Sequence, residues 1–313
     1  MGVLNLRSIR TKATYLVVIA GPTAVGKTAL AIELARHYNT VIVSADSRQF
    51  YREMNIGTAK PSEAQLNEVP HFFINTKHIG ELFGAGHFEK EAKDLLDRLF
   101  EEHELVLMVG GSGLYLDAVL NGVDNFAEVP LETRESLNQL FAEKGLLYIQ
   151  ERLKEQDPEY AQKVDLHNPQ RVIRALEVIQ HTGKTYSSFL NQQKTQRSFT
   201  PIKLLINAPR EELYARINQR VDDMMAAGLL DEVKHLLPFK SHNALKTVGY
   251  QELFDYLDGQ STLEAAVDKI KQHTRNYAKR QLTWFRNKDQ FEEFGAGDVE
   301  KIIAYLDIIL AHG

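Results

Sequence analysis

Short apolar runs alternate with longer stretches of helical periodicity over the first 120 residues of the chain. The apolar runs are residues 16–20, 41–45 and 105–109, a further extended stretch is 71–76, and the amphipathic stretches are 28–38 and 88–102. Continuous apolar runs are typical of strands buried on both faces, and intervening helices supply the crossovers that parallel strands need. The pattern predicts an α/β fold with a doubly wound parallel sheet flanked by helices.

The pattern changes at Asn121-Gly122. Up to about residue 200 we expect only helices, at 131–143, 146–155 and 169–181. Residues 203–207 again have the apolar character of a strand, and from 210 to the end we expect helices with breaks near Pro238 and Gly259. The chain is therefore predicted to have one core, residues 1–120 and 201–313, with a helical insertion domain, residues 121–200, between the fourth and fifth strands.

Composition narrows the class of protein. The 313 residues include no cysteine, so disulfides and cysteine-ligated metal sites are excluded. The formal net charge of −5 argues against a uniformly basic surface, although one segment, residues 269–288, contains seven Lys or Arg residues and no acidic residue. Residues 1–12 have no apolar stretch, and we expect no signal peptide, no membrane span and a cytoplasmic location.

A phosphate-binding motif follows the first apolar run. Its residues are Gly21, Pro22, Thr23, Ala24, Val25, Gly26, Lys27 and Thr28. In this G-x-x-x-x-G-K-T pattern the backbone N–H groups and the helix N-terminus face anionic oxygens, the lysine reaches the outer phosphates, and the threonine hydroxyl binds Mg²⁺. The motif indicates a polyphosphate or pyrophosphate ligand and does not single out ATP.

Polar residues follow two other predicted strands. Asp46 comes directly after the second strand, where it could bind metal, accept a proton or cap a turn. The strand at 105–109 lacks the acidic residue that ordinary P-loop NTPases carry there, and it is followed by Gly110, Gly111 and Ser112. The Ser112 hydroxyl is expected near the phosphates. Arg220 is a candidate to reach an anion at the core.

Two basic features are candidates for RNA contact. Arg171 and Arg174 lie three residues apart and share one helix face, which could equally be solvated. The basic segment 269–288 has aromatic residues interleaved, among them Tyr277 and Trp284, so it suits a nucleic-acid backbone, and the alternative is a solvated basic helix.

Taken together, these residues resemble the family of tRNA dimethylallyltransferases over nearly the whole chain. The matching segments are 21–28, 44–51, 55–61, 110–115, 169–177, 247–250 and 274–286. The resemblance implies a P-loop core and transfer of a dimethylallyl group from dimethylallyl diphosphate to N6 of adenosine 37 in tRNA, with release of pyrophosphate. The P-loop then holds a diphosphate ester, which agrees with the missing acidic residue.

The resemblance also implies roles for individual residues. Lys27, Arg220 and Thr28 with Mg²⁺ neutralise the leaving group, Asp46 accepts or orients the N6 proton, and Ser112 bonds the diphosphate where the family usually has threonine. The residues implied in tRNA binding are Asp46, Ser47, Arg48, Gln49, Gln170, Arg171, Val172, Ile173, Arg174, Arg275, Lys279 and Arg280. The insertion domain grips the anticodon stem-loop, and we expect a monomer.

Three other functions remain open from the sequence. The P-loop and short core are compatible with a kinase of a nucleoside or small metabolite. An isopentenyltransferase acting on free adenine nucleotide shares the donor chemistry. The third function is that of a non-catalytic RNA-binding protein whose P-loop has lost its activity. The intact Lys27, Thr28 and Asp46 argue against this function.

Overall fold

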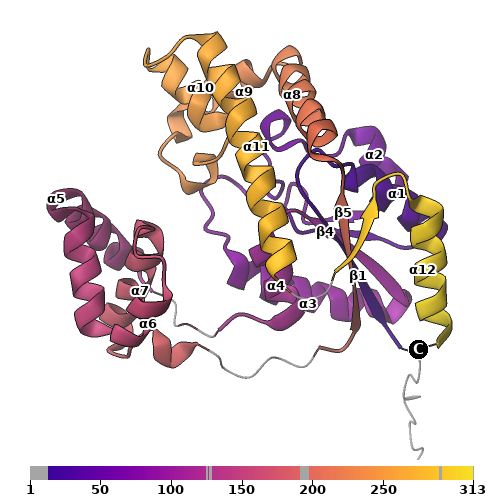
Figure 1. Ribbon diagram of the computed structural model, residues 1–313, viewed down its shortest axis with the longest axis horizontal. Coiled ribbons are helices and arrows are strands. Elements are labelled where there is room, and N and C mark those ends of the chain that lie inside the picture. Colours follow the sequence, from indigo (N-terminus) through magenta and orange to yellow (C-terminus); the bar gives the residue numbers. More distant parts are fainter. Residues whose placement is uncertain (1–12, 125, 127–128, 191–196, 289–290, 313) are drawn as a thin grey trace, which may run out of the picture. The chain divides into compact units, whose positions relative to one another are not determined.

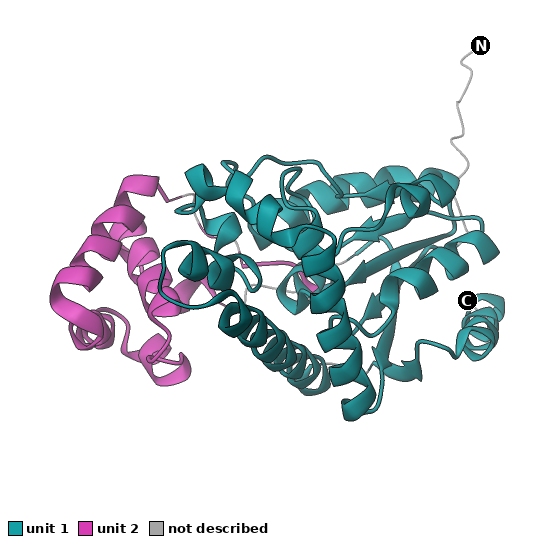
Figure 2. Ribbon diagram, turned by 90° about the horizontal axis from the view of Figure 1, so that it is seen from above, with its two compact units in different colours: residues 1–120, 197–313 teal, residues 121–196 magenta. Residues whose placement is uncertain are grey.

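The computed structural model describes residues 13–124, 126, 129–190, 197–288 and 291–312, so the segment 1–12 lies outside the described residues. The chain forms two compact units (Figure 2). Unit 1 comprises residues 1–120 and 197–313, and unit 2 comprises residues 121–196.

Unit 1 is built on a parallel sheet of six strands in the order β3-β2-β4-β1-β5-β6. Figure 1 labels three of these strands, β4, β1 and β5. The strands are β1 (Tyr15–Ala20), β2 (Ile42–Ser44), β3 (His71–Phe72), β4 (Leu105–Gly110), β5 (Thr200–Asn207) and β6 (Glu292–Gly295). Strand β1 lies at the centre and pairs in parallel with β4 and β5. Because parallel strands all end at the same edge of the sheet, the loops after β1, β2 and β4 come together there.

The alternation of side chains along β1 builds a core on each face of the sheet. Tyr15, Val17 and Ile19 pack on one face, whereas Leu16 and Val18 pack on the other. The first face is covered by α1 (Lys27–His37), α8 (Arg210–Ala226) and α12 (Val299–His312), and the second by α3 (Ala85–Glu102) and α4 (Gly113–Asn121). This arrangement, with the P-loop between β1 and α1, confirms the predicted P-loop α/β fold class.

Helices close the carboxyl-terminal part of unit 1. They are α9 (Leu229–His235), α10 (Tyr250–Leu257) and α11 (Leu263–Asn287), with short 3-10 turns at Leu237–Phe239 and Asn243–Leu245. Their apolar faces share a third core with Tyr250 at its centre, which is fully buried. The basic segment is therefore the second half of a longer helix, α11.

The expectation that only helices follow residue 210 is wrong. Strand β6 pairs in parallel with β5 along the sheet edge. Glu292 and Glu293 are exposed. The strand therefore has no apolar run from which it could be predicted. Charged side chains are the usual composition of an edge strand, because they discourage pairing with other chains.

The regular elements of unit 2 that the structure describes are all helical. Its elements are α5 (Leu131–Gln156), α6 (Pro158–Lys163), α7 (Pro169–Thr182) and a 3-10 turn at Ser187–Phe189. Gly145 has φ 81° and interrupts α5, where two separate helices are predicted. Leu137, Ile149 and Ile173 belong to a separate apolar core within the unit.

Short helical elements complete unit 1 after β2. A 3-10 turn, η1 (Ile56–Thr58), precedes α2 (Glu63–Glu68). Across the described ranges, no helix combines the length and the apolar character that crossing a bilayer requires.

Candidate active site

The P-loop joins β1 to α1 by a tight backbone path. Gly21 has φ 151°, and a Cβ atom there would lie 2.4 Å from the carbonyl oxygen of Ile206. Gly26 has φ 108° and forms the N-cap of α1. Both positions therefore require glycine, because a side chain would either clash or be strained. The loop leaves the N-terminus of α1 directed at the cavity, as anion binding needs.

Lys27 curls back over this loop. Its Nζ donates to the carbonyl oxygens of Gly21 at 2.9 Å and Pro22 at 2.7 Å. Burial lowers the pKa of Lys27 to about 7; the negative charge of Asp46 opposes this shift and the positive charge of Arg220 adds to it. Burial also lowers the pKa of Arg220, whose Nη1 lies 3.5 Å from the Thr23 hydroxyl. Two cations thus converge beside the P-loop.

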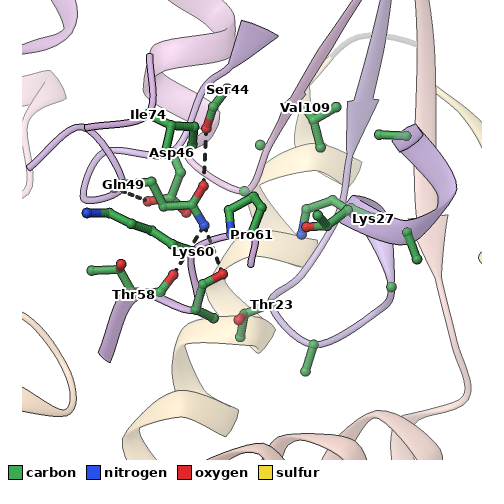
Figure 3. A pocket seen from close by; sticks show the side chains of 18 of the residues that line it. Thr23, Lys27, Ser44, Asp46, Gln49, Thr58, Lys60, Pro61, Ile74 and Val109 are labelled. Atoms are coloured by element: carbon green, nitrogen blue, oxygen red, sulfur yellow. Dashed lines mark hydrogen bonds between the residues drawn. The ribbon is translucent and has the colours of Figure 1, made fainter. Parts of the chain in front are cut away.

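A cavity of about 380 Å³ collects these groups at the ends of β1, β2 and β4 (Figure 3). Its polar lining includes Thr23, Lys27, Thr28, Asp46, Gln49, Lys60, Arg220, Tyr277 and Gln281. The structure therefore brings together, within one cavity, the phosphate-binding loop, the candidate base Asp46 and the candidate cation Arg220. A cavity of this size suits a small phosphorylated ligand.

The Asp46 carboxylate caps a turn, and the same residue lines the cavity. Its Oδ1 accepts hydrogen bonds from the backbone N–H of Arg48 at 2.9 Å and Gln49 at 3.4 Å, which caps the turn after β2. The same residue lines the cavity. The turn-capping geometry fixes the carboxylate in place, and a fixed carboxylate facing a substrate cavity is suited to proton acceptance.

Ser112 bridges the loop after β2 and helix α11. Its Oγ accepts a hydrogen bond from the backbone N–H of Ser47 at 3.1 Å, and it is hydrogen-bonded to the side chain of Tyr277. Burial, with the nearby charge of Asp46, raises the pKa of Tyr277 to about 12, so this phenol stays protonated at neutral pH. Ser112 itself does not line the cavity, and its contact with a diphosphate stays a prediction.

Gln281 is a site residue that sequence reasoning missed. Its Oε1 accepts from the backbone N–H of Thr23 at 2.9 Å, and its Nε2 donates to the carbonyl oxygen of Gly111 at 2.8 Å. A Cβ atom at Gly111 would lie 2.2 Å from that Nε2. Helix α11 therefore holds the P-loop and the turn after β4 together, and Gly111 is required by this close approach.

Glu232 on α9 organises another wall of the cavity, which sequence reasoning also missed. Its Oε2 accepts from the backbone N–H of Asn55 at 3.1 Å and Ile56 at 2.7 Å. Its Oε1 accepts from the backbone N–H of Gly57 at 3.1 Å and from the Tyr250 hydroxyl at 2.7 Å. One carboxylate therefore caps the N-terminal end of η1. The Tyr250 ring fills the space beside Gly57, where a Cβ atom would lie 2.6 Å from it.

The turn after η1 is tied to the loop after β2. Figure 3 shows Gln49 between Ser44 and this turn. The Gln49 Nε2 donates to the carbonyl oxygens of Thr58 at 3.2 Å and Ala59 at 3.3 Å, and its Oε1 accepts from the Ser44 hydroxyl at 3.3 Å. Gln49 is thus engaged in holding the cavity wall, besides its predicted contact with tRNA.

The predicted RNA-binding residues of α11 differ in their surroundings. Lys279 and Arg280 are exposed, whereas Arg275 is partly buried and donates to Asn218 Oδ1 at 2.6 Å. Acidic partners from other elements pair with several other cations of the segment, in the ion pairs Lys271–Asp222, Arg286–Glu293 and Lys288–Asp117. The segment is therefore less strongly cationic in the fold than in the sequence.

Helix α7 carries the remaining RNA-binding predictions, and two of them need correction. Val172 and Ile173 are 0% exposed and pack in the core of unit 2. This burial contradicts the prediction that their side chains bind tRNA. Arg171 is exposed and Arg174 is partly exposed, so both can face a ligand.

The donor set limits how a metal can be held. The described residues contain no group of three His, Asp or Glu side chains arranged as a metal site. The Thr28 hydroxyl and the Asp46 carboxylate both line the cavity, and oxygen donors of this kind fit Mg²⁺, which usually keeps waters and takes phosphate oxygens as ligands. The residues present therefore fit Mg²⁺ bound together with a diphosphate.

Comparison with known proteins gives consistent matches. A family model described as IPP transferase matches residues 49–288. A Flavobacterium johnsoniae protein named tRNA dimethylallyltransferase is 50% identical over 299 residues, 93% of this chain and 97% of the relative. A Bacteroides thetaiotaomicron protein named tRNA dimethylallyltransferase 1 is 48% identical and covers 93% of this chain and 94% of its own.

Two solved structures are similar throughout the fold. The full-length tRNA isopentenylpyrophosphate transferase of Bacillus halodurans has a TM-score of 0.71 and 36% identity, over 95% of this chain and 97% of that one. A eukaryotic dimethylallyltransferase acting on tRNA has a TM-score of 0.75 and 28% identity, over 92% of this chain and 75% of that one.

Proposed function

The chain belongs to the IPP transferase family, and on that basis we propose that it transfers a dimethylallyl group from dimethylallyl diphosphate to N6 of adenosine 37 in tRNA, releasing pyrophosphate. The names of its relatives support a tRNA acceptor. The observation that carries the proposal is that one cavity is lined by both the P-loop and Asp46, while β4 ends at Gly110, followed by Gly111, without the acidic residue of an ordinary NTPase.

The P-loop side of the cavity stabilises the leaving group. An allylic diphosphate ionises readily because the allyl cation is resonance-stabilised, so the barrier depends on how well the departing pyrophosphate is neutralised. Lys27 and Arg220 are the cations at this position, and preorganised charges of this kind act where negative charge develops. The Thr28 hydroxyl would hold Mg²⁺ together with the diphosphate, and the ion would supply further neutralisation of the leaving group.

Asp46 serves the acceptor. The adenine amine is a weak nucleophile because its lone pair is delocalised into the ring. As the bond from N6 to C1 of the donor forms and the C1–O bond breaks, N6 must lose one proton, and the Asp46 carboxylate accepts it. The turn bonds from Arg48 and Gln49 hold that carboxylate at the cavity, so the base is positioned before the substrate arrives.

Reaching an anticodon-loop base requires the base to leave its stack and enter the cavity. We assign the guiding contacts to residues Asp46, Ser47, Arg48 and Gln49 in unit 1, to Gln170, Arg171 and Arg174 in unit 2, and to Arg275, Lys279 and Arg280 on α11. Unit 2 binds the anticodon stem-loop, and the enzyme acts as a monomer.

The test is transfer of labelled dimethylallyl from its diphosphate, with Mg²⁺, to unmodified tRNA carrying adenosines at positions 36 to 38. AMP and a tRNA with guanosine at position 37 serve as parallel acceptors. Label on the first tRNA alone is the expected result. Label on AMP identifies an enzyme of free nucleotides, and turnover of ATP without any transfer identifies a kinase; either outcome overturns the proposal.

A further inference from the structure

Unit 2 holds a buried carboxylate that faces two arginines. Glu177 on α7 is 2% exposed, and its oxygens lie 3.7 Å from Arg134 Nε and 3.3 Å from Arg174 Nη1. The two arginine side chains are 42% and 38% exposed. Helices α5 and α7 thus present two guanidinium groups at the surface over one acidic group beneath them.

Among the described residues, two guanidinium groups share one carboxylate, so the charges of this cluster do not cancel. A buried carboxylate requires a partner, because an unpaired charge in the interior is strongly destabilising. One arginine satisfies that need, so the second leaves a surplus positive charge. The surplus lies beside Gln170 and Arg171, which the sequence already marks for RNA contact.

Both guanidinium groups are held in place by further contacts. Arg134 Nη2 donates to Gln170 Oε1 at 3.0 Å. The Arg174 guanidinium lies 5.5 Å from the centre of the Phe126 ring, and that ring stacks on Tyr186 at 4.6 Å with 19° between the planes. Arginine binds phosphate through a planar fork of donors, and a fork fixed in advance loses little side-chain entropy on binding.

We propose that Arg134 and Arg174 form a clamp for a backbone phosphate of the tRNA, with Glu177 as the positioning residue that fixes their spacing. The inference rests on the proposed tRNA substrate and adds Arg134 to the residues that bind it. One arginine would be enough to pair with Glu177 and to join α5 to α7. Here two arginines converge on Glu177, and both side chains keep exposed surface that a ligand can contact.

The experiment measures the dissociation constant of unmodified tRNA for the full-length protein over a range of KCl concentrations. Arg134→Gln removes one fork and leaves Glu177 its Arg174 partner. Lys154→Gln is the matched control, because Lys154 lies on the same helix, carries the same charge and is paired with Glu151 at 2.7 Å.

We expect Arg134→Gln to weaken tRNA binding about tenfold and to lower the slope of log affinity against log salt by about 0.7–0.9, the value for one released counterion. Arg134→Lys keeps the charge without the fork, so it should restore the slope and only part of the affinity. Lys154→Gln should change neither quantity.

A wild-type affinity and slope for Arg134→Gln overturn the clamp, and so does a lowered melting temperature with an unchanged slope, which identifies a purely structural network. Because binding is read without transfer, the clamp is judged separately from the reaction. If the wild-type protein transfers the label and Arg134→Gln binds tRNA normally, only the clamp is contradicted. If the wild type and the variants bind tRNA with the expected slopes but the wild type transfers no label, only the proposed reaction is contradicted.

Discussion

The side-chain amide of Gln281 joins two glycine-containing turns, because it accepts from the N–H of Thr23 at 2.9 Å and donates to the carbonyl oxygen of Gly111 at 2.8 Å. Gln281 is 6% exposed. Helix α11 thereby fixes the distance between the P-loop and the turn after β4, so the helix that carries the basic segment is directly bonded to the phosphate-binding loop.

Gln281→Ala should loosen that cradle. Each buried backbone group left unpaired costs about 1–3 kcal/mol, so we expect lower stability to urea and at least fivefold weaker binding of pyrophosphate by calorimetry. Gln272→Ala, at an exposed position on the same helix, is the control and should leave both unchanged. Wild-type pyrophosphate affinity in Gln281→Ala would show that the cradle holds its shape without α11.

Asp46→Asn should separate binding from chemistry. The amide oxygen of asparagine can still accept from the N–H of Arg48 and cap the turn, but asparagine cannot take a proton. We expect tRNA affinity within twofold of wild type and a single-turnover transfer rate lower by about 10²–10⁴-fold, the usual contribution of a general base. An unchanged rate would remove Asp46 from the mechanism.

The depressed pKa of Lys27 predicts a pH dependence of diphosphate binding. As the pH rises through about 7, the ligand-free protein loses the Lys27 proton, and the cavity loses a positive charge. Binding an anion restores that proton, so above pH 7 the affinity should fall by up to about tenfold per pH unit, with proton uptake.

Calorimetry with pyrophosphate in buffers of different ionisation enthalpy measures this uptake. Lys27→Arg is the control, since it stays charged while every ionisation of pyrophosphate itself is retained. The wild type should take up more protons than Lys27→Arg between pH 7 and 9. Equal proton uptake by the two proteins would show that Lys27 is already charged before the ligand binds.

Glu232→Gln should affect the cavity without touching a substrate. Glutamine can accept through one oxygen only, so either the N–H groups of Asn55 and Ile56 or the N–H of Gly57 and the Tyr250 hydroxyl lose their acceptor. We expect KM for dimethylallyl diphosphate to rise more than kcat falls. Asp231→Asn, at the exposed neighbouring position that pairs with Lys234, should match the wild type.

A rise in KM for tRNA alone would contradict this assignment, because Thr58, Ala59 and Lys60, which directly follow the backbone that Glu232 caps, line the cavity. Equal effects of Glu232→Gln and Asp231→Asn would indicate a general loss of stability. Melting temperatures of both variants separate that case from a local change.

The strands that end at the cavity were predictable because each is buried on both faces and so reads as an apolar run. The P-loop was predictable because its glycines, lysine and threonine must follow one another along the chain. Strand β6 was not, since its glutamates face solvent at a sheet edge. Gln281 and Glu232 were not, since their roles arise only where segments distant in sequence meet.

The error at Val172 and Ile173 had a signal in the sequence. With Leu176 they form an apolar stripe on one face of α7, and such a stripe faces a core. The motif that resembles the family is a continuous run of residues, whereas a helix exposes only some of its positions. Periodicity would have assigned Gln170, Arg171 and Arg174 to the surface and the two apolar residues to the interior.

The chain leaves and re-enters unit 1 at two points that Arg197 holds together. Its Nη2 donates to the carbonyl oxygen of Ala118 at 2.9 Å and pairs with Glu89 at 2.7 Å. With respect to the sheet, the inserted helices are therefore a loop whose two ends are held together. The entropic cost of closing a loop depends only weakly on its length, at about 0.6 kcal/mol per doubling. Nested folding of this kind lets the insertion unfold, lengthen or diverge in sequence while β4, β1 and β5 stay paired.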